Sequence, residues 1–272
     1  MKPELQRRVQ RYGWDKAAAY YEHSWQKQLQ PAHDLLLSKT NIQPSDHILD
    51  IAAGTGLLTF RMHEQIGPQG KIIATDISDE MVKIGSETVI AKHLKNVTFE
   101  RMDAENLNIS SESIDLVTCA LGLMYLPDPD KCLSEIYKVL KPSGRVVVAI
   151  WGSRKNCGWA EIFPIVDARV SSDVCPMFFN LGESNVLQYT FEKAGFNAIE
   201  IAKIETLLHY STADEACKAA FLGGPVALAY SRFDETTKTA AKKEYLDSIA
   251  SYKTQKGYEI LGEFVIGSAI KN

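Results

Sequence analysis

Several patterns that would place this sequence of 272 residues in a particular class of protein are missing. There is no apolar run of 18 residues, as a membrane-spanning helix requires, and no apolar segment like that of a secretory signal near the start. The five cysteines form no Cys-x-x-Cys pair, and the six histidines lack zinc-ligand spacing. We therefore expect a cytoplasmic protein with reduced thiols, no integral membrane segment and no bound metal.

An excess of charge of either sign is also missing. Thirty Lys and Arg residues face 34 Asp and Glu residues, which gives a net charge of -4. No basic run interleaved with aromatic residues stands out, so nucleic acid is not an expected partner. The apolar content of 45% and the charged content of 24% are those of an ordinary globular domain. No pattern indicates an oligomeric state.

The most informative segment is a strand that runs into a glycine turn. The strand, residues 48–51, carries Asp50 near its end, and the turn spans residues 52–56. A second buried strand ends in Asp76. Glycine lets the backbone approach a ligand closely, and carboxylates at strand ends accept hydrogen bonds from hydroxyl and ammonium groups. The combination predicts a site for a nucleoside that carries hydroxyls and an amine, and we infer S-adenosylmethionine.

A dinucleotide is the alternative ligand. Its fingerprint requires a third glycine or an alanine where this sequence has Thr59, and Asp50 would repel a pyrophosphate. Asp76 fits either ligand, because both contain a ribose. An NAD-dependent oxidoreductase therefore remains an alternative, as does a noncatalytic protein with a methyltransferase fold.

Five ordered motifs, at residues 50–56, 76–81, 102–105, 114–120 and 139–145, carry a family resemblance. Over roughly residues 15–151 the chain resembles the class I S-adenosylmethionine-dependent methyltransferases, of type 11, and within them the ubiquinone/menaquinone biosynthesis C-methyltransferase group. Ala52 stands where the family has a glycine. The backbone accepts this departure if Ala52 does not need a positive φ.

The resemblance implies a role for each matched residue. Asp76 holds the ribose, Ile77 and Met81 flank the adenine, and Asp103 and the backbone of Ala104 bind the adenine edge. An N-terminal segment folds over the donor and brings one tyrosine to the methionine carboxylate or the substrate. The predicted donor-binding residues are Tyr21, Asp50, Ala52, Gly54, Thr55, Gly56, Asp76, Ile77, Met81, Asp103, Ala104 and Cys119.

Strand and helix patterns alternate as in a doubly wound α/β sheet. The expected strands are residues 47–51, 71–75, 97–102, 114–120, 145–151, 198–208 and 263–270. The resemblance implies a seven-stranded Rossmann-like sheet of order 3-2-1-4-5-7-6, with strand 7 antiparallel. We expect one domain over residues 1–272. Its parts are an N-terminal helical cap (1–45), a donor-binding core (46–151) and two helical, substrate-side lid insertions (152–190 and 211–257).

Methyl transfer from a sulfonium is an in-line displacement that depends mainly on positioning. A general base is needed only if the nucleophile carries a proton of high pKa, and His209, just past the sixth strand, is the candidate. The resemblance favours a small-molecule acceptor of apolar or aromatic character, and leaves O-, N-, S- and C-methylation open.

Overall fold

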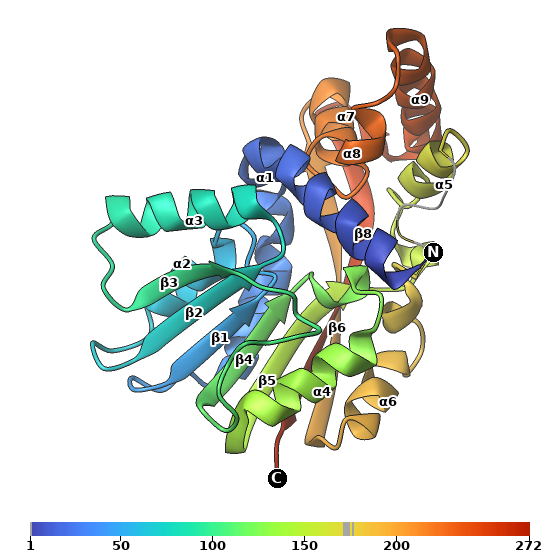
Figure 1. Ribbon diagram of the computed structural model, residues 1–272. Helices are drawn as coiled ribbons and strands as arrows, with labels where there is room; N and C mark the ends of the chain where they lie inside the picture. The colour runs from blue at the N-terminus through green and yellow to red at the C-terminus, as the bar shows by residue number, and fades with distance from the viewer. Residues whose placement is uncertain (1, 171–174, 176) are drawn as a thin grey trace.

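The computed structural model describes residues 2–170, 175 and 177–272 (Figure 1). Its centre is an eight-stranded sheet of order β3-β2-β1-β4-β5-β8-β6, and β7 pairs with β8 off this path. The first five strands are parallel, whereas β8 runs antiparallel to both of its neighbours, β5 and β6. The strands are β1 (His47–Ile51), β2 (Lys71–Asp76), β3 (Val97–Arg101), β4 (Ile114–Ala120), β5 (Leu140–Trp151), β6 (Asn197–Tyr210), β7 (Lys253–Thr254) and β8 (Gly257–Ile270).

The predicted strand order is confirmed, with β8 as the seventh strand of the prediction, but the last strands differ in length. β8 begins at Gly257 and not at Glu263, and its pairing with β6 continues to Tyr210↔Tyr258. The prediction also missed the two-residue strand β7. Residues 257–262 alternate between more and less buried positions, as a strand does, but the proximity of helical patterning hid this signal.

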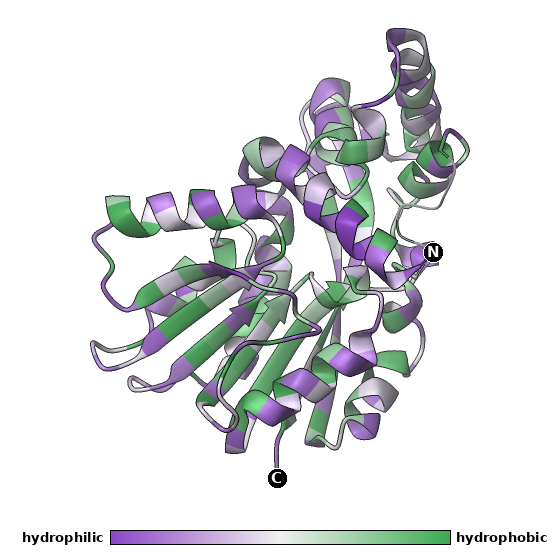
Figure 2. Cartoon of the chain, in the orientation of Figure 1, coloured by the Kyte–Doolittle hydropathy of each residue, from purple (hydrophilic) through white to green (hydrophobic). Residues whose placement is uncertain are grey.

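Helices cover both faces of the sheet. In Figure 1, α4 and α6 lie in front of it, and α1 and α2 lie behind it. Figure 2 shows hydrophobic residues along the central strands, with polar residues toward the outer side of α4. The helices are α1 (Pro3–Thr40), α2 (Leu57–His63), α3 (Asp79–Ala91), α4 (Pro129–Val139), α5 (Ile162–Asp167), α6 (Val186–Lys193), α7 (Ala213–Phe221), α8 (Ala227–Tyr230) and α9 (Glu235–Ser248).

Local sequence explains where the helices that flank the pocket begin. The Ser78 hydroxyl accepts a hydrogen bond from the Met81 N–H at 3.1 Å and caps α3, whose first turn is acidic. Asp128 caps α4 in the same way through the Lys131 N–H, and a proline follows at the first helical position. Both caps lie at the carboxyl ends of the parallel strands, so they fix the edge at which the pocket lies.

The core lies along the central strands, where Leu49, Leu116 and Val147 are fully buried. Parallel register pairs Ile51 of β1 with Thr75 of β2, so these two strands end side by side. The N-terminal half of α1 crosses above these strand ends (Figure 1). In the described ranges, no helix combines the length and apolar character that crossing a membrane requires.

Candidate functional site

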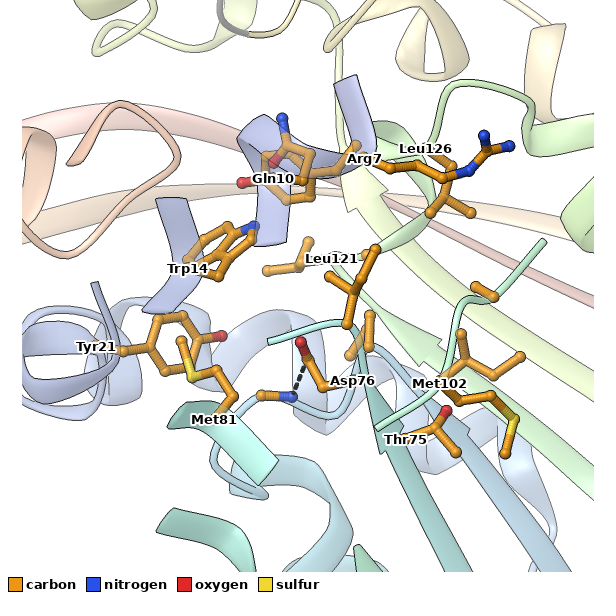
Figure 3. Close-up of a pocket in the computed structure, with 18 of the residues that line it drawn as sticks. Arg7, Gln10, Trp14, Tyr21, Thr75, Asp76, Met81, Met102, Leu121 and Leu126 are labelled. Atoms are coloured by element: carbon orange, nitrogen blue, oxygen red, sulfur yellow. Dashed lines mark hydrogen bonds between the residues drawn. The ribbon is translucent and has the colours of Figure 1, made fainter. Parts of the chain in front are cut away.

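A pocket lies at the carboxyl ends of β1, β2 and β4, beneath the N-terminal half of α1 (Figure 3). It encloses about 720 Å³ of space, open solvent at its mouth included. Pockets of this size hold small molecules and cofactors. Side chains of α1, the glycine turn, β2, α3 and the loop after β4 line it.

The glycine turn forms one wall and depends on left-handed backbone. Gly54 has φ +58°, and a Cβ there would lie 3.4 Å from the Tyr21 ring, so this glycine allows the ring to approach. Ala52 has φ +54°. The condition set for the departure from the family motif is therefore not met, because Ala52 does take a positive φ and carries the steric cost that a glycine would avoid.

Asp76 presents its carboxylate to the pocket from the end of β2. One oxygen accepts a hydrogen bond from the Gly54 N–H, marked in Figure 3, and the other accepts one from the Ser78 N–H, both at 2.9 Å. Burial raises the pKa of Asp76 to about 6, against these hydrogen bonds, which favour the ionised form. The carboxylate is held rigidly and keeps lone pairs for a ligand's hydroxyl groups.

Asp50 lies deeper and is 1% exposed. Its two oxygens accept hydrogen bonds from the Thr59 hydroxyl at 2.6 Å and the Thr118 hydroxyl at 2.7 Å. Burial raises the pKa of Asp50 to about 6 as well. Thr59, the residue that breaks the dinucleotide fingerprint, is thus part of the support of this carboxylate. Asp50 does not line the main pocket but a smaller cavity beside it.

The other predicted donor-binding residues divide into two groups. Tyr21, Ala52, Gly54, Ile77, Met81 and Ala104 line the main pocket. Thr55, Gly56 and Cys119 lie behind its wall, and burial raises the pKa of the Cys119 thiol to about 12, so it is neutral. Asp103 is turned toward α1, where one of its oxygens lies 3.2 Å from Nε of Arg7.

Helix α1 supplies a cover that the motifs did not reveal. Arg7, Gln10 and Trp14 line the pocket above Asp76 (Figure 3). Arg7 also forms an ion pair with Glu105, whose side chain is 1% exposed. Further along α1, Asp15 accepts hydrogen bonds from the Ser78 hydroxyl at 2.7 Å and from the N–H at position 80 at 3.2 Å. No motif marks these residues, and only their contacts across the chain identify them.

A second cavity adjoins the first, with about 360 Å³ of space. All four tryptophans of the chain, at positions 14, 25, 151 and 159, line it. It shares Trp14, Tyr21, Leu121 and Tyr125 with the main pocket. No charged side chain lines it within the described part of the chain. The two cavities together form a polar-edged chamber next to an aromatic one.

His209 is not brought to either cavity. Its side chain is 64% exposed, and its Nδ1 lies 3.9 Å from a carboxylate oxygen of Glu259. It lines a separate surface groove beside Gln28 of α1. The described ranges also hold no group of three or more His, Cys, Asp or Glu side chains that could bind a metal ion.

Sequence comparison finds methyltransferases. A family profile described as a methyltransferase domain matches residues 42–174. The demethylmenaquinone methyltransferase of Lactococcus lactis is 31% identical over 189 residues, which are 63% of this chain and 75% of that protein. That of Lactobacillus johnsonii is 30% identical over 62% of this chain and 65% of its own length. The ubiquinone/menaquinone biosynthesis C-methyltransferase UbiE of Teredinibacter turnerae is 36% identical over 56% of this chain and 60% of its own length. The chain thus spans less than two thirds of the last two relatives.

Solved structures share the fold. The YcgJ protein from Bacillus subtilis has a TM-score of 0.65 at 18% identity, covering 89% of this chain and 99% of that one. The phosphoethanolamine N-methyltransferase 2 of Haemonchus contortus, solved in complex with S-adenosyl-L-methionine, has a TM-score of 0.62 at 17% identity, covering 94% of this chain and 57% of that one.

Proposed function

Because this chain belongs to the class I S-adenosylmethionine-dependent methyltransferases, we propose that it transfers the methyl group of S-adenosylmethionine to a small, flat, apolar acceptor. The observation that carries the acceptor class is the cavity lined by all four tryptophans beside the main pocket. The relatives' names, which refer to demethylmenaquinone and to ubiquinone and menaquinone biosynthesis, support a reduced quinone ring as that acceptor.

The residues of the main pocket fit the donor. Asp76 would accept hydrogen bonds from the ribose hydroxyls, since its carboxylate is fixed and faces the pocket. Ile77, Met81 and Ala104 offer an apolar slot for the adenine. Asp103 and Cys119 stand behind this lining, so their contribution would be to hold Arg7 and to pack the strand end.

The aromatic cavity fits a neutral ring. Aromatic side chains stabilise flat apolar ligands by burial and by stacked or edge-to-face contacts. Each segment predicted as a cap or lid contributes to this cavity: Trp25 comes from residues 1–45, Trp159 from residues 152–190, and Pro225 from residues 211–257. These contributions support a role for all three segments in enclosing the acceptor.

The protein's own residues would mainly position the reactants. S-adenosylmethionine, when bound, supplies an electrophilic methyl group on its sulfonium. Tyr21 lines both cavities, and burial keeps its pKa well above the ordinary value, so its hydroxyl stays protonated and can donate a hydrogen bond. Trp14 and Tyr125 stand with it between the two cavities and would align the acceptor and exclude water. His209 has no place in this scheme.

The test is transfer of isotope-labelled methyl from S-adenosylmethionine to a reduced demethylmenaquinone with a short isoprenoid tail. Phosphoethanolamine, a charged acceptor of similar accessibility in water, serves as the comparison. Labelled quinol and unlabelled phosphoethanolamine are expected. Donor binding without transfer to any quinol would favour the noncatalytic alternative, and binding of NAD with no binding of S-adenosylmethionine would favour the oxidoreductase.

A further inference from the structure

A small side cavity opens beside the main pocket and is closed on its far side by His33 of α1. It holds about 230 Å³ of space and shares Tyr21, Ala52 and Ala120 with the main pocket. Asp50 lines it opposite the cover of α1. The cavity is therefore large enough for a short amino-acid chain and carries a carboxylate on one wall.

The direction of the donor follows from the fixed groups of the main pocket. With the ribose at Asp76 and the adenine between Ile77 and Met81, the methionine end must point to the other end of the pocket, toward Ala52 and Ala120. That end leads into the side cavity. Asp50 there suits the donor's ammonium group, but it would repel the donor's carboxylate. The carboxylate needs a hydrogen-bond donor on another wall.

We propose that the imidazole of His33 is that donor and holds the carboxylate of the methionine end. This inference rests on the proposed use of S-adenosylmethionine. His33 is 5% exposed and lines the side cavity, and its ring nitrogens have no hydrogen-bond partner among the described residues. A buried polar ring without a partner is costly, and an anionic ligand would satisfy it.

The charges around His33 agree with this role. Burial, and next the positive charge of Arg61, lower the pKa of His33 to about 4, while Asp34 opposes them. His33 is therefore neutral near pH 7 and offers one N–H donor. Arg61 and His33 also line a common groove on the outer side of the cavity wall, so a cation stands behind the ring. A carboxylate is thus favoured over an ammonium group at this wall.

Calorimetric titration of the full chain with two ligands tests the inference. One ligand is S-adenosylmethionine, and the other is its decarboxylated form, which keeps the ammonium group and lacks only the carboxylate. His33→Leu should weaken binding of S-adenosylmethionine by roughly tenfold or more, as expected for a lost hydrogen bond to a charged group. Binding of the decarboxylated form should change less than about twofold. His33→Gln, which keeps an N–H donor, should recover part of the loss.

The control is His23→Leu, an exposed histidine on the same helix, which should bind both ligands like the wild type. Equal losses for both ligands in His33→Leu, or no loss at all, would overturn the role of His33. If that variant does not fold, the wild type still decides, because equal affinity for the two ligands contradicts any carboxylate contact. Failure of the wild type to bind either ligand is a different result, and it would overturn the proposed function itself.

Discussion

At the scale of single residues, Ala52 and Gly122 form a matched pair in the pocket wall. Ala52 has left-handed backbone and a methyl group where the related motif has glycine. A Cβ added to Gly122 would lie 2.4 Å from the Ala52 Cβ and 2.9 Å from Sγ of Cys119. The glycine at 122 therefore makes room for the methyl group at 52, and the absence of one side chain is tied to the presence of the other.

This pairing predicts a coupling between two substitutions. Gly122→Ala should lower the free energy of unfolding by about 1–3 kcal/mol, because the added methyl group overpacks the wall. Ala52→Gly removes the nearer clash and the backbone strain, so Gly122→Ala should cost less in that background. Denaturant unfolding of the two single variants and the double variant measures the coupling. Additive losses would mean that the two side chains do not meet.

The carboxylate of Asp76 makes donor affinity dependent on pH. Its pKa in the ligand-free protein is about 6, raised by burial, so the group is mostly ionised at pH 7.5 and mostly protonated at pH 5. Only the ionised form offers the ribose hydroxyls a charged acceptor. The dissociation constant of S-adenosylhomocysteine should therefore rise as the pH falls through 6, by at most about tenfold per unit for one group.

The control for this prediction is Asp76→Asn, which has no titratable group at the site. At pH 7.5 it should bind S-adenosylhomocysteine roughly ten- to a hundredfold more weakly than the wild type. Its affinity should change less between pH 7.5 and 5.5, with Asp50 and other groups setting the remainder. A pH dependence as steep as that of the wild type would assign the effect to another residue.

His209 was the candidate base from the sequence, and its position predicts the opposite result. Because its side chain is 64% exposed and lies at a separate groove, His209→Ala should leave both donor affinity and methyl transfer within about twofold of the wild type. Steady-state kinetics with the quinol acceptor would measure this. A large fall in turnover with unchanged donor affinity would restore a catalytic role.

At the scale of elements, α1 is attached over the pocket by polar contacts at several points along its length. The most buried of these is the ion pair between Arg7 and Glu105, since Glu105 is 1% exposed. Its other carboxylate oxygen accepts a hydrogen bond from the Asp128 N–H at 3.1 Å. Glu105 thus joins α1 to the start of α4, and Arg7 balances its charge.

Loss of Arg7 should loosen the N-terminal half of α1. Arg7→Met would leave the Glu105 carboxylate buried without its cation, which is strongly destabilising for a buried pair. We expect faster amide hydrogen exchange over roughly residues 3–20 and faster release of S-adenosylhomocysteine, with little change in the sheet. Arg8→Met is the matched control, because Arg8 is exposed and forms no ion pair within the described residues. Unchanged exchange in Arg7→Met would show that packing alone holds the helix.

At the scale of the whole molecule, the parallel half of the sheet and its glycine turn were predictable from sequence. Their signals are local, since apolar runs, turn glycines and caps lie within a few residues of each other. Contacts between distant segments were not predictable. Arg7 meets Glu105 across 98 residues, and Thr118 meets Asp50 across 68. Donor-site motifs could therefore be found, but the cover over them and the inward bonding of Asp50 could not.

The gathering of all four tryptophans around one cavity gives the molecule a single optical reporter. A quinone analogue that binds there should quench most of the intrinsic fluorescence, and the quenching should saturate with one dissociation constant. Trp159→Phe should remove part of the signal and keep the protein folded. A ligand bound at a distant surface would quench weakly and without saturation.

The place of β8 between β5 and β6 also bears on how the chain is made. During synthesis β6 leaves the ribosome about 60 residues before β8 is complete, and β8 is its only neighbour in the sheet. At about 5–20 residues per second, β6 waits roughly 3–12 seconds with its backbone unpaired. Nascent chains stalled in that interval should hold the parallel strands in place while β6 is exposed to chaperones and to other nascent chains.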